Sequence, residues 1–145
     1  MNKWKPETFE DKLILSYFKE NGGTIYTEVP TPWSGGEKDW PKGYTNRYID
    51  AVRIPNTEKE NKIKPFADHG EEFLKSVEGK IIELIEVKER LNRYLIGQLL
   101  AGHDLFKADY SPKKIKLVAL CQTSEPGLEW VCKNRKIKIE ILNPF

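Results

Sequence analysis

The sequence predicts an α/β protein with a single mixed sheet flanked by helices on both faces. Segments with helical periodicity alternate with short apolar segments typical of strands. Early strands follow one another as antiparallel hairpins, whereas a later pair is separated by a helix, as in a crossover connection. The expected order is α-β-β-β-α-β followed by a C-terminal α-β pair. A chain of 145 residues can bury one sizeable core, so residues 1–145 are expected to form one domain.

The chain opens with a helix, a strand and a long loop. The spacing predicts a helix over 7–21, which the Asn-Gly-Gly sequence then ends. Residues 24–29 alternate like a strand. Residues 30–43 contain Trp33 and Trp40 among prolines and glycines, and loops of this length are often functional. The apolar residues at helical spacing are Phe9, Leu13, Ile14, Tyr17 and Phe18.

The middle of the chain supplies two strands on either side of a polar segment. Residues 44–54 form the second predicted strand, and 55–79 is a second insertion. Within it a short helix is expected after Asp68, with Glu71 placed as in a capping box. Residues 80–88 are apolar on both faces, which indicates a central strand. The second strand is expected to share one face among Tyr48, Asp50, Val52 and Ile54.

Four elements complete the chain. Asn92 is a suitable cap for a helix running to about residue 107. A buried strand is expected over 115–121, a short helix over 127–134 and an alternating strand over 136–142.

Composition excludes several classes of protein. Apolar residues make up 39% and charged residues 32% of the chain, and the formal net charge is +2, so a basic surface depends on how charges are sorted. No apolar run reaches the ~20 residues of a membrane span, and the N-terminus lacks the apolar segment of a signal peptide. The expectation is a cytoplasmic protein that does not contact a membrane. Cys121 and Cys132 are too few for a disulfide framework and are predicted to be buried free thiols.

Charged residues on two apolar strands indicate a site. Glu86 and Lys88 point to the same face at the end of a strand that is otherwise isoleucine, leucine and valine. Asp50 interrupts its own strand in the same way. Charges on a core strand are costly unless they are paired or bind a metal. If the two strands are neighbours, Asp50 and Glu86 stand side by side, and Mg²⁺ would relieve their repulsion.

These residues resemble the PD-(D/E)xK nuclease superfamily, whose restriction-endonuclease-like core has the order α-β-β-β-α-β. Glu86-Val87-Lys88 is similar to the E-x-K motif of the family, and Asp50 takes the place of its preceding aspartate. The resemblance extends over about 7–121. It implies a metal-dependent deoxyribonuclease, in particular an endonuclease, that hydrolyses phosphodiester bonds in DNA. It further implies that Asp50, Glu86 and the Val87 carbonyl hold Mg²⁺, for which Mn²⁺ substitutes, and that Lys88 positions the attacking water.

Two further positions fit the family pattern. An acid on the first helix is frequent in the family, and Glu10 fits best, with Glu28 as the alternative. Gln98 lies on the helix after E-x-K, where RecB-type members carry a glutamine that orients the lysine or the water. Gly102 stands where that branch has a tyrosine. Alternatively, Glu10 only adds negative charge to the first turn of the helix, where the helix dipole favours it. Gln98 is, in the alternative reading, an ordinary helix residue.

Basic residues flank the predicted acids. Arg47, Arg53 and Arg93 are candidates for phosphate contacts. The structural alternative is a surface network of ion pairs with Glu83, Glu86 or Glu89. The predicted partner is DNA, and a homodimer would supply two sites for two strands. The alternative function is a non-catalytic DNA-binding or assembly subunit that retains the nuclease fold.

Overall fold

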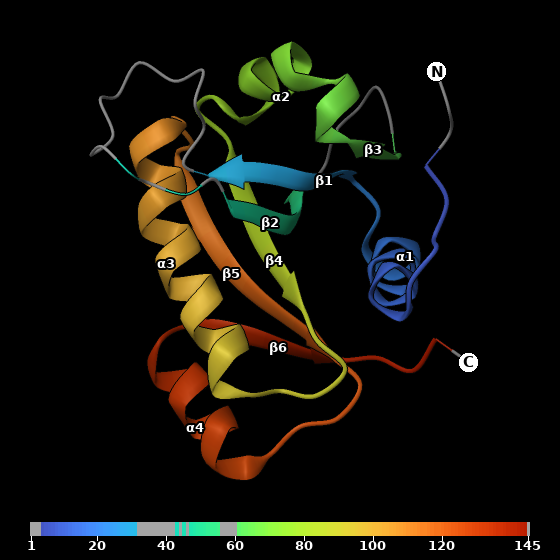
Figure 1. Cartoon of the computed structure of the whole chain (residues 1–145), viewed down its shortest axis with the longest axis vertical. Helices are drawn as coiled ribbons and strands as arrows, with labels where there is room; N and C mark the ends of the chain where they lie inside the picture. Colours follow the sequence, from blue (N-terminus) through green and yellow to red (C-terminus); the bar gives the residue numbers. More distant parts are fainter. Residues whose placement is uncertain (1–3, 32–42, 44, 46, 56–60, 145) are drawn as a thin grey trace.

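A six-stranded mixed sheet forms the centre of the computed structural model, which describes residues 4–31, 43, 45, 47–55 and 61–144. The strand order is β3-β1-β2-β4-β5-β6 (Figure 1). Strands β1, β2 and β4 pair antiparallel, whereas β4, β5 and β6 are parallel, which confirms the predicted mixed sheet. The strands are β1 (Thr24–Thr31), β2 (Arg47–Ile54), β3 (Ile63–Pro65), β4 (Ile81–Val87), β5 (Lys114–Cys121) and β6 (Ile137–Ile141).

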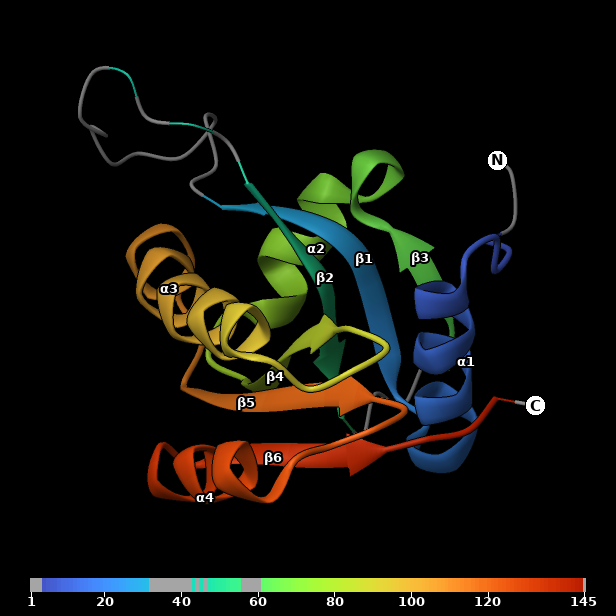
Figure 2. The same cartoon turned by 60° about the horizontal axis from the view of Figure 1, so that its bottom comes forward.

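Helices cover both faces of the sheet, as predicted (Figure 2). Helix α1 packs on one face, where Leu13 and Tyr17 are fully buried against Ile85 and Val118 of the sheet. The other three α-helices pack on the opposite face and build the larger core. The helices are α1 (Phe9–Asn21), α2 (Gly70–Val77), α3 (Arg93–Asp109) and α4 (Pro126–Asn134), with a short 3-10 helix, η1 (Phe66–Asp68), before α2.

Side-chain caps fix the starts of the two helices that border the site. The Thr8 hydroxyl accepts a hydrogen bond from the Asp11 N–H at 3.0 Å, and the Asp11 carboxylate accepts from the Thr8 N–H, so α1 starts with a capping box. Asn92 caps α3 through a 2.8 Å bond from the Leu95 N–H, as the sequence predicts. Each cap fixes the residue at which its helix begins.

Residues 61–79 are more regular than the insertion predicted over 55–79. Strand β3 pairs in parallel with β1, and it was missed because three residues are too few to show a period and end in proline, which an edge strand tolerates. The predicted capping box at Asp68 is wrong, because α2 begins at Gly70 and Asp68 belongs to η1. The start of the predicted loop 30–43 also changes, since β1 extends to Thr31. Trp33 and Trp40 lie outside the described residues.

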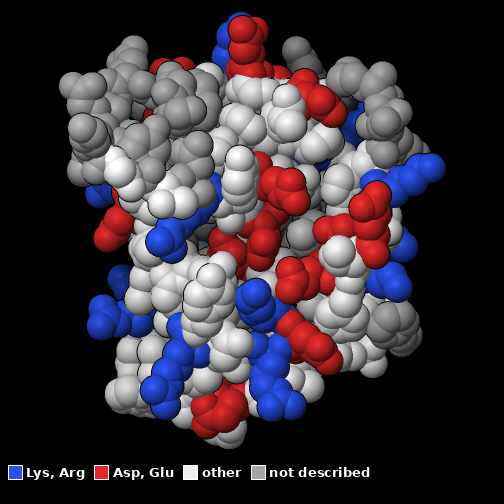
Figure 3. Space-filling view, viewed as in Figure 1, with Lys and Arg blue, Asp and Glu red and all other residues white. Residues whose placement is uncertain are grey.

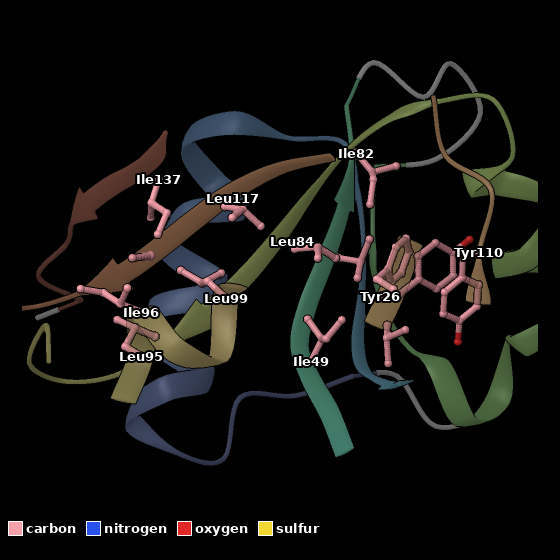
Figure 4. Close-up of a cluster of buried hydrophobic side chains, with 14 of the residues drawn as sticks. Tyr26, Ile49, Ile82, Leu84, Leu95, Ile96, Leu99, Tyr110, Leu117 and Ile137 are labelled. Atoms are coloured by element: carbon pink, nitrogen blue, oxygen red, sulfur yellow. The ribbon is translucent and has the colours of Figure 1, made fainter. Parts of the chain in front are cut away.

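The larger core reveals a break in the alternation of β2. Ile49, labelled in Figure 4, and Val52 both belong to this core. Ala51 belongs instead to the core against α1, so the predicted single face from Tyr48 to Ile54 is wrong. Glu28 and Asp50 lie between the register pairs Thr27–Ala51 and Val29–Ile49. Glu28 has a φ of 51°, in the left-handed region, and lies on β1 at the level of this break in β2.

Two further expectations concern the whole chain. Cys121 and Cys132 are both buried and free, as predicted, and burial raises the pKa of the Cys121 thiol to about 11. Among the described helices, α3 is the longest at 17 residues, and none has the length and hydropathy needed to span a bilayer.

Candidate active site

The candidate site lies where β2 and β4 separate. Their ladder ends at the pair Ala51–Ile85, so Asp50 and Glu86 are the next two opposed positions. Beyond that pair, backbone N–H groups bond to side-chain carboxylates of the other strand. The Val87 N–H donates to Asp50 Oδ2 at 2.8 Å, and the Asp50 N–H donates to the Glu86 carboxylate. The expected neighbourhood of the two acids is therefore present in the structure.

The two carboxyl groups lie side by side, Glu86 buried and Asp50 half-buried. Glu86 is 3% exposed, and its Oε2 atom has no hydrogen-bond partner. Burial, followed by the adjacent charge of Asp50, raises the pKa of Glu86 to about 10. Burial also raises the pKa of Asp50, against the hydrogen bonds from Glu86 and Val87 that lower it. At neutral pH the pair therefore retains a proton that two exposed carboxyl groups would lose.

Of the two candidates for a third acid, Glu10 is electrostatically linked to this pair. Burial raises the pKa of the half-buried Glu10, the charge of Asp50 raises it further, and Lys88 lowers it. Helix α1 therefore brings Glu10 toward the same site. Glu28 is exposed on β1, opposite Asp50 in the strand register. Its left-handed backbone conformation is strained for a residue other than glycine, and such strain is often found at functional sites.

Lys88 is the cation of the site. It follows β4 directly, and its N–H donates to the Leu120 carbonyl at 3.0 Å, which holds the backbone beside β5. Its ammonium group lies 5.4 Å from the centre of the Tyr94 ring, within range of a cation–π interaction. The same charge lowers the pKa values of Glu10, Asp50 and Glu86. Lys88 thus favours the ionised forms of all three acids.

Gln98 reaches the site from α3. Together with Glu86 it lines a cavity of about 220 Å³ between this helix and the sheet. Its Oε1 atom is buried without a hydrogen-bond partner. Tyr94 lines the same cavity one helical turn earlier. Sequence reasoning missed Tyr94, although its four-residue spacing from Gln98 placed both on one face of the helix.

The structure separates the three candidate arginines. Arg47 and Arg93 are exposed, and Arg47 lines the cavity beside Glu86. Arg53 is 8% exposed and pairs with Glu83 at 2.9 Å. Its other nitrogens donate to the carbonyl oxygens of Gly22 and Asn21. The predicted phosphate contact is therefore wrong for Arg53, because its donors are already used inside the protein; the structural alternative, an ion pair with Glu83, is what forms.

A divalent cation fits the acid pair, although no cluster of three or more histidine, cysteine or acidic side chains with metal-ligand geometry occurs among residues 4–31, 43, 45, 47–55 and 61–144. Mg²⁺ commonly uses one or two carboxylates and completes its shell with water. Asp50 and Glu86 supply these carboxylates, and the unpartnered Oε2 of Glu86 is an available ligand atom. In the orientation of Figure 1, acidic side chains gather around a hollow in the middle of the molecule, and basic side chains lie below it (Figure 3).

Glu86→Gln should stabilise the protein at neutral and alkaline pH. Between about pH 4.5 and 10 the native state holds a proton that the unfolded chain has lost, so the free energy of unfolding falls as the pH rises. Glutamine removes this dependence, and we expect a gain of about 1–3 kcal/mol at pH 8. Urea unfolding at pH 5 and pH 8 measures it. The exposed Glu78→Gln variant is the control, and equal pH slopes for wild type and Glu86→Gln would contradict the assignment.

Comparisons with known proteins address the fold. No protein-family model matches the sequence, and no curated protein matches it either. The structure is similar to the crystal structure of a repair endonuclease from Pyrococcus abyssi, with a TM-score of 0.51 and 12% sequence identity. The match covers 100% of this chain and 50% of that one, so this chain spans half the length of the neighbour. At this identity, the likeness shows a shared fold alone.

Proposed function

We propose that this protein is a metal-dependent deoxyribonuclease of the PD-(D/E)xK type that hydrolyses phosphodiester bonds in DNA. The observation that carries the proposal is the pair of the half-buried Asp50 and the buried Glu86, with a free carboxylate oxygen and Lys88 beside it. The fold shared with a repair endonuclease supports a nuclease. The pair lies where the ladder between β2 and β4 ends, directly beyond the register pair Ala51–Ile85.

Each residue of the site has a proposed role. Asp50, Glu86 and the Val87 carbonyl would hold one or two Mg²⁺ ions, with Mn²⁺ as a substitute. Bound there, the metal would polarise a phosphoryl oxygen and lower the pKa of a coordinated water. Lys88 would orient the attacking water and stabilise the negative charge that grows on the phosphate oxygens. Gln98 would orient the water or Lys88.

Exposed residues around the acids suit a nucleic-acid substrate. Arg47 and Arg93 remain available for phosphates on either side of the scissile bond. Tyr48 and Tyr94 are 61% and 64% exposed, and such rings stack on unpaired bases. Glu10 would complete the acidic side of the site. Two such sites would let the protein cut both strands of a duplex, so we expect a homodimer. Sedimentation of the protein with and without DNA would measure its oligomeric state.

Incubation of the protein with labelled plasmid, single-stranded and branched DNA tests the proposal. We expect cleavage with Mg²⁺ or Mn²⁺, none with EDTA, and loss of cleavage in Glu86→Ala. The Glu78→Ala variant, which changes an exposed glutamate away from the site, should cut like wild type. Binding of DNA without cleavage of any substrate would instead favour a non-catalytic DNA-binding or assembly subunit, with the exposed arginines as its contact surface.

A further inference from the structure

The cavity beside Glu86 has features of a ligand pocket that hydrolysis alone does not require. It lies between α3 and the ends of β1, β2 and β4, and its volume is about 220 Å³. Ile49 and Leu105 contribute apolar walls, while Thr31, Glu86 and Gln98 contribute polar groups. It is smaller than the roughly 300 Å³ at which pockets for drug-sized ligands begin, and it exceeds the roughly 30 Å³ that one water occupies.

Unpartnered oxygen atoms are concentrated around this cavity. In the described part of the chain, four buried side-chain polar atoms lack a hydrogen-bond partner, and three belong to residues that line it: Thr31 Oγ1, Glu86 Oε2 and Gln98 Oε1. Thr31 is 2% exposed and Glu86 is 3% exposed. An unmet buried acceptor costs about 1–3 kcal/mol, so three at one cavity indicate a place built to receive hydrogen-bond donors.

One lining position of α3 carries no side chain, because it is a glycine, Gly102. Tyr94, Gln98 and Gly102 follow one another at four-residue intervals and all line it. A Cβ atom at Gly102 would meet the Ile49 side chain at 3.8 Å, an ordinary contact distance. Close packing therefore does not demand glycine here, and a longer side chain at this position would enter the open space.

We infer that this cavity binds one unpaired nucleobase that carries an exocyclic amino group, beside the phosphodiester that the acid pair hydrolyses. The inference rests on the proposed function, because Glu86 belongs to both the acid pair and the cavity wall. Apolar walls suit the faces of a base, and the unpartnered oxygen acceptors suit an amino group such as that of cytosine or adenine. Tyr48 and Tyr94, exposed on the lining, would stack the neighbouring bases.

Binding of two matched oligonucleotides in EDTA tests this inference without requiring catalysis. Single-stranded octamers of deoxycytidine and deoxyuridine differ on one edge of the base. Cytosine has an amino group at C4 and an acceptor at N3, whereas uracil has an oxygen at C4 and an N–H group at N3, so cytosine offers two N–H donors on that edge and uracil one. One additional hydrogen bond is worth about 1 kcal/mol, so wild type should bind the cytidine octamer about fivefold more tightly. Equal affinities, or no binding of either octamer, would overturn the inference.

Variants locate the preference within the cavity. Gly102→Leu should fill the space and reduce the ratio of the two affinities to about one. Thr31→Val removes one oxygen without changing the shape and should lower the ratio even if the leucine variant does not fold. Gly97→Ala is the matched control, because Gly97 lies on the same helix with nothing near its Cβ position, and it should retain the preference. A preference that persists in both cavity variants would overturn the inference.

The outcomes separate this inference from the nuclease proposal. Metal-dependent cleavage without a preference between the octamers would leave the proposed function in place and remove the base pocket. The wild-type protein could instead prefer the cytidine octamer, lose this preference in Gly102→Leu, and cut no DNA. That result would support the base pocket and contradict the hydrolytic role of Glu86.

Discussion

Lys88→Met is expected to reduce the rate of DNA cleavage by about 10³-fold while the protein remains folded. Methionine keeps the length of the side chain over Tyr94 but removes the charge that lies beside the three acids. Loss of one group that stabilises charge in a transition state costs about 10²–10³-fold, and loss of a proton-transfer group about 10²–10⁴-fold. Single-turnover cleavage at saturating protein measures the effect on the chemical step.

A second lysine over a tyrosine ring provides the control. Lys138, on β6, lies 5.8 Å from the centre of the ring of Tyr17, on α1, and pairs with Glu140 at 3.0 Å. Lys138→Met removes the same charge on the opposite side of the sheet from α3, so its cleavage rate should stay within about twofold of wild type. Wild-type cleavage by Lys88→Met would show that the assignment of Lys88 is incorrect.

Arg53→Met is expected to lower the free energy of unfolding by about 3–5 kcal/mol. The guanidinium group pairs with Glu83, which also accepts a 2.8 Å hydrogen bond from the Tyr17 hydroxyl, and it satisfies the carbonyl oxygens of Gly22 and Asn21 at the end of α1. The substitution would leave Glu83 buried without its cation, the costly way to break a buried pair. Urea unfolding followed by circular dichroism measures the loss.

The surface pair Lys138–Glu140 again supplies a comparison. Its side chains are 52% and 26% exposed, so Lys138→Met should cost less than about 1 kcal/mol. The double variant Arg53→Met, Glu83→Leu removes both charges and should recover part of the stability lost in the single variant. A loss below 1 kcal/mol in Arg53→Met would contradict the structural role of this network.

Strong local patterns account for the parts of the fold that the sequence predicts. Asn92 and the apolar stripe after it define α3, and the run of apolar residues before Glu86 defines β4 as a central strand. Strand β3 has only three residues and owes its place to pairing with β1, which no local pattern records. The start of α2 was misplaced for a related reason, because η1 occupies the position where a cap at Asp68 was expected.

The candidate site, too, could be predicted only where local sequence patterns determine it. Adjacent positions for Asp50 and Glu86 could be predicted, because two neighbouring antiparallel strands bring them together. The hydrogen bond from the Val87 N–H to Asp50 could not, because it depends on the separation of β2 from β4. The misassignment of Arg53 has a similar cause: spacing places a basic residue near an acid, but only the packing of α1 shows that the residue is buried.

The central claim is that Asp50 and Glu86 hold a divalent cation, and titration of the protein with Mn²⁺ in a calorimeter tests it most directly. Wild type should bind the ion with release of a proton at pH 7, seen as a binding heat that changes with the ionisation enthalpy of the buffer, because the metal displaces the proton that the pair retains. Asp50→Asn should lose this binding, while Glu78→Gln keeps it. Absence of binding in wild type, or unchanged binding in Asp50→Asn, would contradict the account.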